Sequence, residues 1–505
     1  MNALRPLRKV LIANRGEIAI RVARTARRMG LKTVALFAEQ DRESQHLDFC
    51  DEAHSLGVGP ISDTYLSIER VLGIARQSGA DCIHPGYGFL SERATFAKAC
   101  ADAGVKFVGP QPQSMDEMGD KIRSKQFMKA LGVPLVPGSD GAVSDKSEAR
   151  QIADRVGYPV LLKASAGGGG KGMRIVHSAS ELEAALEGAA REAKAYFGDG
   201  TVFIEKYLTS PHHVEVQVVG DGEGGGGHVF DRECSIQRRH QKLLEESPAP
   251  LLGRHPASKK KLLDLSQNVV ARMKYESAGT LEYVADDDGN VYFLEMNTRL
   301  QVEHPVTEWV TGIDLVERQF RVAMGERLKA EPLASAQRGH AIEVRIYSET
   351  PFDHLPTGGR VVDVLFPQGP FVRVDSAIYP GYDVPTEYDP TLLKLSVWGE
   401  DRSQAIDRLA SALEELRILG VQSNQALFRA ICSEPDFRKG MYGTPYLDLH
   451  RAALQAGSET AFADLVKRVG PALLNQSVGG SAIVGTGVES LWAWNARRSG
   501  QESGL

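Results

Sequence analysis

Two glutamates in the middle of the chain, Glu282 and Glu295, are the strongest candidates for metal ligands. They lie in TLEYVA and VYFLEMN, which alternate like β-strands on either side of DDDGN (286–290). If Asp288 and Gly289 form a two-residue hairpin turn, the two glutamates stand directly opposite each other on one face. Like charges in that position repel unless a cation lies between them, and oxygen ligands without His or Cys indicate Mg²⁺ or Mn²⁺ rather than zinc. The alternative is that both glutamates face solvent and that a bulge changes the register.

A row of polar side chains is expected to extend this hairpin. The second strand is predicted to continue as EMNTRLQVEHP, and side chains alternate between the two faces of a strand. Such alternation occurs in any half-exposed strand, so the prediction of a site depends on the facing glutamate and on a phosphate-binding loop nearby. The polar face would carry Glu295, Asn297, Arg299, Gln301 and Glu303.

The glycine-rich stretch GGGGKG (167–172) is the candidate phosphate-binding loop. It lies between YPVLLKASA and MRIVHS, which are typical of strands, whereas a dinucleotide-binding turn requires a helix after the glycines. A Walker A loop requires Ser or Thr after Lys171, where this chain has Gly172. We therefore predict a mobile hairpin whose backbone N–H groups fold over a polyphosphate without any Cβ in the way. The second glycine run, 224–227, carries no charge and is interpreted as a turn.

Basic residues are concentrated in CSIQRRHQK (234–242), which contains Arg238, Arg239, His240 and Lys242. This cluster predicts a local anion site, although a run of charge is more often a solvated segment. The sequence contains neither HExxH nor GxSxG, so a metalloprotease or a serine hydrolase has no support.

Composition excludes several other classes of protein. The chain has 505 residues with 59 basic and 65 acidic side chains, so it has no bulk positive field for nucleic acid or an anionic membrane. Its five cysteines form no CxxC pair, which argues against a disulfide framework or structural zinc and fits a cytoplasmic location. The N-terminal apolar run is too short for a signal peptide, and the uncharged stretch 469–488 is too weakly apolar for a membrane span.

The order of the predicted elements is α/β at the N-terminus and α+β afterwards. Residues 1–115 alternate strands and amphipathic helices, which predicts a parallel sheet. Ligand-binding loops of such a sheet lie at the carboxyl ends of its strands, and HPGYGFLSE (84–92) directly follows one. Hairpins dominate residues 116–335. Residues 336–450 contain short strands and one amphipathic helix, SQAIDRLASALEELRILG, and residues 451–505 are unassigned.

Several ordered motifs resemble the biotin carboxylase family, the ATP-grasp enzymes that carry out the first half-reaction of biotin-dependent carboxylases. The resemblance runs from about residue 7 to about residue 450, and chance agreement of all the motifs is negligible. It implies an N-terminal Rossmann-like domain, a central ATP-grasp domain with a mobile lid at about 134–206, and a C-terminal mixed α/β domain. The motifs are IANRGEIA (12–19), HPGYGFLSE (84–92), KASAGGGGKGMR (163–174), ECSIQRRHQK (233–242), EMNTRLQVEHPVTE (295–308), GHAIEVRI (339–346) and LPTGG (355–359).

The resemblance implies where ATP and its metal ions bind. Glu205 and Leu208 would lie at the adenine hinge, and Glu282 and Glu295 would hold Mg²⁺ or Mn²⁺ with Asn297 beside them. The implied nucleotide-binding residues are Lys121, Lys163, Gly168, Gly169, Glu205, Leu208, His213, Gln237 and His240.

It also implies how bicarbonate and biotin react. Glu303 would be the general base, because removing a proton from bicarbonate while its oxygens are charge-paired makes attack on the γ-phosphate feasible. The resulting carboxyphosphate would give CO₂ and phosphate, and the phosphate would take the ureido proton of biotin. Arg345 would stabilise the biotin enolate, and Tyr87 would line the biotin pocket. Bicarbonate would be held by Lys242, Arg299, Gln301 and the backbone of Val302.

The expected partners follow from the same resemblance. The sequence contains no AMKM-like biotinylation motif; RMKY (272–275) comes nearest and lies in a predicted helix. Biotin is therefore expected on a separate carrier protein or on a region outside this sequence, and a carboxyltransferase subunit is expected to use the carboxyl group. We expect an α-subunit type of an acyl-CoA or 2-oxo acid carboxylase, in a homodimer or larger complex.

Glu387 and Thr391 depart from the commoner family pattern, which bears on subunit contacts. The alternatives are another ATP-grasp ligase, of carbamoyl-phosphate or purine type, and a catalytically silent scaffold.

Overall fold

The computed structural model describes residues 6–459 apart from 140, 144, 165–172, 198–199, 240 and 386. The chain forms two units, Met1–Arg451 and Ala452–Leu505. The described residues of the second unit, 452–459, are helical. Among the described helices, none has both the length and the apolar composition that a membrane span needs.

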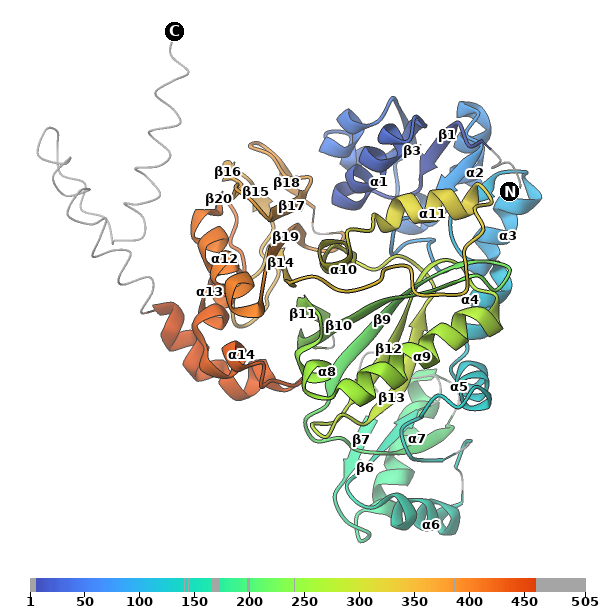
Figure 1. Ribbon diagram of the computed structural model, residues 1–505, viewed down its shortest axis with the longest axis vertical. Coiled ribbons are helices and arrows are strands. Elements are labelled where there is room, and N and C mark those ends of the chain that lie inside the picture. The colour runs from blue at the N-terminus through green and yellow to red at the C-terminus, as the bar shows by residue number, and fades with distance from the viewer. Residues whose placement is uncertain are drawn as a thin grey trace, which may run out of the picture. The chain divides into compact units, whose positions relative to one another are not determined.

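The N-terminal part of the first unit contains the predicted parallel sheet (Figure 1), with the strand order β3-β2-β1-β4-β5. Strand β1 alternates between two cores, because Val10 and Ile12 pack with residues of α1 while Leu11 packs with residues of α2. Helices on both faces therefore bury Val10, Leu11 and Ile12. The elements are β1 Lys9–Ile12, α1 Gly16–Arg28, β2 Lys32–Ala38, β3 Glu52–Gly57, α2 Ile68–Ser78, β4 Cys82–His84, α3 Ala94–Asp102 and β5 Lys106–Phe107.

The loop after β4 is fastened to the loop after β1 at the carboxyl ends of the strands. The Asn14 Nδ2 group donates to the carbonyl oxygens of Pro85 and Tyr87, each at 2.8 Å. Gly86 has φ +64°, and a Cβ there would lie 2.8 Å from Asn14 Nδ2, so a side chain would disrupt this contact. Tyr87 is held in this loop, at the edge of the sheet where ligand-binding loops gather.

A second sheet has eight strands in the order β13-β12-β9-β10-β11-β14-β19-β17. It crosses the predicted boundary near residue 335, because β11 pairs antiparallel with β14, for example Glu245 with Glu343. Hairpin spacing in the sequence could not show this long-range pairing, which joins the two regions into one surface. Its strands are β9 His212–Asp221, β10 Gly226–Arg238, β11 Gln241–Ser247, β12 Glu276–Ala285, β13 Val291–Asn297, β14 His340–Tyr347, β17 Val372–Ser376 and β19 Thr391–Gly399.

Helices and small sheets surround the large sheet. Two-stranded sheets join β15 to β18 and β16 to β20. The bounds are α4 Pro112–Gly119, α5 Lys121–Ala130, α8 Pro250–Arg254, α9 Pro256–Met273, α10 His304–Thr311, α11 Leu315–Ala323, β15 Gly359–Arg360, β16 Asp363–Leu365, β18 Asp383–Val384, α12 Arg402–Glu415, β20 Arg417–Leu419, α13 Gln425–Ser433 and α14 Pro435–Lys439.

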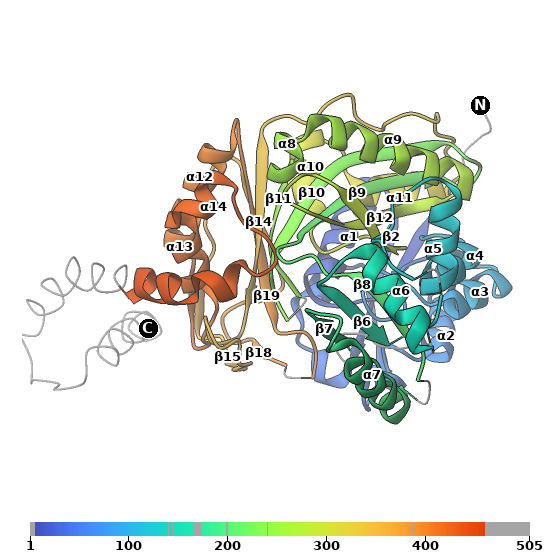
Figure 2. The ribbon, with the colours of Figure 1, turned by 90° about the horizontal axis from the view of Figure 1, so that it is seen from below.

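A smaller three-stranded sheet, β7-β6-β8, has its own core with α6 and α7 (Figure 2). The predicted hairpin on either side of the glycine-rich stretch is confirmed, because β6 pairs antiparallel with β7 from Val160–Val176 to Lys163–Met173. Its tip, including Gly168 and Gly169, lies outside the described residues. The elements are α6 Lys146–Val156, β6 Val160–Ala164, β7 Met173–Val176, α7 Leu182–Phe197 and β8 Val202–Lys206.

The hairpin β12–β13 corrects one sequence prediction and confirms another. The predicted two-residue turn is wrong: Asp286 N–H donates to the Asn290 carbonyl, Gly289 lies at φ +77°, and residues 287–289 form a three-residue loop. The carboxylate of Asp286 accepts from the backbone N–H groups of Asp288 and Asn290, which stabilises this longer turn. A bulge next to Glu282 compensates for the extra residue, so Glu282 still pairs with Glu295.

Two elements end earlier than predicted. Strand β13 ends at Asn297, so the row of polar residues through Glu303 does not continue as one strand face. Beyond it the chain turns into α10, whose second residue is Pro305, and proline is favoured in the first turn of a helix. Helix α12 ends at Glu415, and the following RIL forms β20, where β-branched Ile418 pairs with Val364.

Candidate active site

One face of the large sheet carries polar side chains and the other packs against α9. In β9, Val214, Val216 and Val218 lie in the core with Leu262 and Val270 of α9. The residues between these valines point to the opposite face, and all of them are buried. That opposite face carries His213, Glu215 and Gln217. Sequence reasoning selected His213 and missed Glu215, although the alternation of VEVQVVG places both on the same face.

The ammonium group of Lys242 on β11 lies at the centre of this polar face. It contacts Glu215 at 2.6 Å, Glu282 at 2.8 Å and Glu303 at 2.6 Å, so residues from two strands and the segment before α10 converge on it. The amide oxygen of Gln301 lies 3.5 Å away. Burial alone would lower the pKa of Lys242, but the surrounding glutamates outweigh it and raise the pKa well above its usual value. The ammonium group therefore stays charged.

Arg232 on β10 lies beneath this cluster and was not predicted from the sequence. Its guanidinium is fully buried and contacts the Glu215 carboxylate, and it donates to Gln217 Oε1 at 2.7 Å and to Gln301 Oε1 at 3.1 Å. In FDRECS an arginine on the buried face of a strand gives no signal of its own. The guanidinium therefore holds two of the side chains that neighbour Lys242, those of Glu215 and Gln301.

Glu303, the predicted base, lies between two cations. Its Oε1 contacts Lys242, and its Oε2 accepts from Arg345 Nη2 at 2.9 Å, while Arg345 is also paired with Glu245 at 2.6 Å. Burial alone would raise the pKa of Glu303, but Lys242 and Arg345 outweigh it and hold that pKa well below its usual value. The carboxylate is therefore ionised and can accept a proton once the charge of its neighbours is engaged elsewhere.

The predicted metal ligands stand at one edge of this face. Glu282 is buried and accepts from Asn297 Nδ2 at 2.7 Å, whereas the opposing Glu295 is exposed. Partial desolvation and then the charge of Glu282 raise the pKa of Glu295. His213 Nε2 lies 3.2 Å from Glu282. The donor set is rich in carboxylate and amide oxygen, which fits Mg²⁺ or Mn²⁺.

The predicted nucleotide residues that the structure describes come from both the smaller sheet and the large sheet, and from α5. Lys163 on β6 and Lys125 on α5 both contact the carboxylate of Glu205 on β8. Lys125 was missed, because nothing in its helix distinguishes it from other surface lysines. Lys121 begins α5, Leu208 follows β8, and Gln237 lies near the end of β10, where its amide donates to the Cys234 carbonyl. His240 lies outside the described residues.

Arg299 differs from its predicted placement. Its guanidinium donates to Glu92 at 2.9 Å and to Asn297 Oδ1 at 3.1 Å, and Glu92 also accepts the N–H of Thr298. Arg299 and Glu303 were expected to share one strand face, but β13 ends before both of them. Glu92 belongs to the loop HPGYGFLSE, so a side chain of the N-terminal domain orients the arginine.

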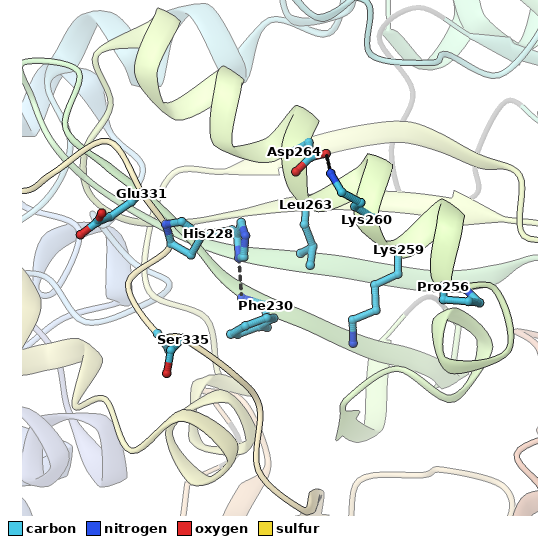
Figure 3. Close-up of a pocket in the computed structure, with 11 residues that line it drawn as sticks. His228, Phe230, Pro256, Lys259, Lys260, Leu263, Asp264, Glu331 and Ser335 are labelled. Carbon is cyan, nitrogen blue, oxygen red and sulfur yellow. Dashed lines mark hydrogen bonds and ion pairs between the residues drawn. The ribbon is translucent and has the colours of Figure 1, made fainter.

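A separate surface cavity of about 640 Å³ lies beside α9 (Figure 3). It is lined by His228 and Phe230 of β10, by residues of α9 such as Lys259, and by the segment 331–335. No sequence-predicted site residue lines it. Apart from Tyr87 in the loop after β4, the sequence-predicted residues that the structure describes come from strands of the large and smaller sheets or just beyond them, and from the start of α5.

Comparison with known proteins matches almost the whole described chain. Residues 6–115 match "Biotin carboxylase, N-terminal domain", 120–331 match "Carbamoyl-phosphate synthase L chain, ATP binding domain", and 343–449 match "Biotin carboxylase C-terminal domain". The chain is 47% identical over 449 residues to a pyruvate carboxylase subunit of Methanothermobacter thermautotrophicus, covering 89% of this chain and 91% of the relative. It is 45% identical over 443 residues to a biotin carboxylase of Halalkalibacterium halodurans, covering 88% and 98%.

Solved structures agree with these sequence relatives. The Campylobacter jejuni biotin carboxylase in complex with beta-gamma-ATP has a TM-score of 0.82 at 44% identity, covering 88% of this chain and 99% of that one. The biotin carboxylase domain of a thermophilic 2-oxoglutarate carboxylase bound to bicarbonate has a TM-score of 0.85 at 44% identity, covering 90% and 99%.

The fold and the polar face define an ATP-dependent ligase of the ATP-grasp type. The chain belongs to the biotin carboxylase family. It uses ATP, Mg²⁺ and bicarbonate to carboxylate biotin, which is the first half-reaction of a biotin-dependent carboxylase.

Proposed function

We propose that bicarbonate is activated at the polar face of the large sheet, around Lys242. The observation that carries this proposal is the contact of one ammonium group with Glu215, Glu282 and Glu303. Glu282 is also the proposed metal ligand and Glu303 the proposed base, so the two functions meet at a single buried cation. Once a metal ion binds Glu282, Lys242 would be freer to pair with an entering anion, in a low-dielectric environment where its charge is most effective.

The metal would be held by Glu282 and Glu295, with Asn297 beside them. When bound, Mg²⁺ would neutralise charge on the ATP phosphates. Lys121, Lys163, Gly168, Gly169, Glu205, Leu208, His213, Gln237 and His240 are the proposed nucleotide-binding residues. The contacts of Lys163 and Lys125 with Glu205 support this, because each partly exposed lysine could exchange the carboxylate for a phosphate oxygen when a nucleotide binds.

Bicarbonate would be held by Lys242, Arg299, Gln301 and the backbone of Val302, with Glu303 taking its proton. In the ligand-free protein the neighbouring cations keep the pKa of Glu303 too low for an efficient base. An anion paired with Lys242 offsets that positive charge, so the pKa of Glu303 rises when its substrate is bound. The activated oxygen would then attack the γ-phosphate and form carboxyphosphate.

Biotin would be carboxylated beside Arg345 and Tyr87. The guanidinium of Arg345 is buried and lies 2.9 Å from Glu303, which supports its role in stabilising the biotin enolate next to the site where CO₂ is released. The proposed domain limits are 1–115, 116–335 and 336–450, with residues 451–505 as a tail; the family matches at 6–115, 120–331 and 343–449 support them.

The proposed partners are a biotin carrier protein or domain and a carboxyltransferase subunit. Support comes from the names of relatives, which include a subunit of pyruvate carboxylase and the small subunit of 2-oxoglutarate carboxylase. These relatives are named for different carboxyl acceptors, so we propose that the carboxyltransferase chooses the acceptor. We also propose a homodimer, as in the solved 2-oxoglutarate carboxylase domain dimer, and a cytoplasmic location, consistent with five cysteines that form no disulfide.

The decisive experiment measures ADP release by the purified chain with free biotin as acceptor. Release should require Mg²⁺ and should rise when bicarbonate and biotin are added together. ADP release that does not depend on bicarbonate or biotin would contradict the proposal and would favour another ATP-grasp ligase. Absence of any ADP release would favour a silent scaffold.

A further inference from the structure

Lys394 is a fully buried lysine that contacts the backbone of the site. It lies on β19, its side chain is 0% exposed, and its Nζ donates to the carbonyl oxygen of Val302 at 2.9 Å. Its ammonium group also lies 5.7 Å from the centre of the Tyr87 ring. A charged lysine with no access to water is costly, so its retention here calls for specific partners.

Those partners are carboxylates from three different elements. Glu17 of α1 approaches Nζ at 3.4 Å, Asp375 of β17 pairs directly opposite Lys394 in the sheet, and Glu343 of β14 lies nearby. Burial alone would lower the pKa of Lys394, but the acidic neighbours outweigh it and keep the lysine ionised. Burial raises the pKa of Glu17 to about 7 and that of Glu343 well above its usual value, whereas Arg373 and Lys394 outweigh burial at Asp375 and lower its pKa. Both carboxylate oxygens of Glu17 and of Glu343 are buried without a hydrogen-bond donor among the described residues. Lys394 is thus a buried cation with acidic groups from α1, β14 and β17 around it.

The segment that Lys394 holds has no strand to support it. Strand β13 ends at Asn297 and α10 begins at His304, so the carbonyl of Val302 lies between two regular elements. Arg345 pairs directly opposite Lys394 across β14 and β19, and residues in opposite positions point to the same face. Arg345 contacts the side chain of Glu303 while Lys394 contacts the carbonyl of Val302. Neighbouring cations of one sheet therefore hold consecutive residues.

We propose that Lys394 is a positioning residue for the carboxylation site: by holding the Val302 carbonyl, with Glu17 as its counterion, it orients the Val302–Glu303 backbone toward bicarbonate. The inference rests on the proposed function of Val302 and Glu303. Lys394 donates to a carbonyl rather than to a substrate, so its effect passes through these two residues. Because Glu17 belongs to the IANRGEIA motif, the N-terminal domain takes part in orienting a segment of the ATP-grasp domain.

The test is the steady-state kinetics of Lys394→Met, with bicarbonate and ATP varied separately and free biotin as acceptor. Losing one hydrogen bond to a charged donor should raise the bicarbonate KM roughly 10- to 100-fold, while the ATP KM stays within about twofold. A purely structural role would lower the amount of active protein and leave both KM values unchanged. An unchanged bicarbonate KM in a folded variant would overturn the proposal.

A second variant keeps the test decisive if Lys394→Met does not fold. The double variant Lys394→Met/Glu17→Gln removes the lysine together with one of its carboxylates, so less uncompensated charge remains buried. It should recover folding and still show the raised bicarbonate KM, because the Val302 carbonyl still lacks its donor. A double variant with the wild-type bicarbonate KM would overturn the proposal.

Lys259→Met is the matched control. Lys259 also pairs with a fully buried carboxylate, that of Asp231 at 2.7 Å, and it lies at the cavity beside α9 (Figure 3). Its contacts are with Asp231 and Gln337, away from the 298–303 segment. It should lower the melting temperature and leave the bicarbonate KM unchanged. If the wild-type protein shows no bicarbonate-dependent ADP release, the proposed function itself is wrong. If the wild type shows that release and only the Lys394 variants keep the wild-type bicarbonate KM, the proposed role of Lys394 alone is wrong.

Discussion

Replacing Glu303 with glutamine separates the proposed base from every other residue of the site. Glutamine keeps the size of the side chain and can still accept a hydrogen bond, but it cannot take a proton. Turnover should fall by roughly 10² to 10⁴, the range expected for a lost general base. The ATP KM should stay near the wild-type value, because the Glu303 carboxylate contacts Lys242 and Arg345 rather than the proposed nucleotide residues.

The same substitution should also destabilise the ligand-free protein. Breaking a buried ion pair costs about 3 to 5 kcal/mol when the partner charge stays buried. Here the cost should lie near the lower limit, about 3 kcal/mol, because each cation keeps another carboxylate. Lys242 retains Glu215 and Glu282, and Arg345 retains Glu245. A thermal melt of the purified variant beside the wild type measures this loss of stability.

Glu308→Gln is the matched control for both measurements. Glu308 lies on α10 and is paired with Arg21 and Arg373, each at 2.7 Å, so it too is a buried carboxylate between two cations. It should lose stability to a similar degree and keep turnover within about twofold, because its guanidinium partners are not the cations that hold Glu303. If Glu303→Gln instead raised only the apparent requirement for ATP or Mg²⁺, Glu303 would be a nucleotide or metal group, and the assignment of the base would be wrong.

Four further substitutions and a change of pH test other parts of the protein. Glu295→Gln should raise the Mg²⁺ requirement without lowering the melting temperature, since Glu295 is exposed and repelled by Glu282. Glu282→Gln should also raise the Mg²⁺ requirement but should lower the melting temperature, because Glu282 accepts three hydrogen bonds. A magnesium titration with parallel melts checks both, and full activity of either variant would defeat the metal assignment. Arg299→Lys keeps the charge but loses the planar fork, so its deficit should appear mainly in bicarbonate KM. Burial lowers the pKa of His46 to about 4 and of His84 to about 3 from 6.5, so both are neutral when folded. Stability present above pH 6.5 should therefore fall as pH decreases toward 4, by roughly 2 kcal/mol per histidine at about pH 5, and melts of His84→Gln across that range should show a shallower slope.

The hairpin β12–β13 shows how far local pattern can carry a prediction. The alternation of TLEYVA and VYFLEMN was enough to place Glu282 opposite Glu295, because neighbouring strands of a short hairpin have few registers available. The prediction of a two-residue turn was wrong, because the Asp286 carboxylate stabilises a three-residue loop. A bulge next to Glu282 compensates for the extra residue. The type of turn depends on hydrogen bonds from side chains to the backbone, and an Asp-Gly pair in the sequence does not reveal these bonds.

Periodicity and motifs of a few residues were sufficient to predict the parallel N-terminal sheet, the hairpin beside the glycine-rich stretch and the pairing of Glu282 with Glu295. They could not predict that Lys242 meets three glutamates, that Glu92 orients Arg299, or that Lys394 holds Val302. Each of these contacts joins residues that are far apart in the chain or separated by an irregular segment. Their physical basis is the strand order of the large sheet, which brings β12, β9, β11, β14 and β19 into one surface, and the docking of the loop that carries Glu92; alternation within a single strand cannot report on either.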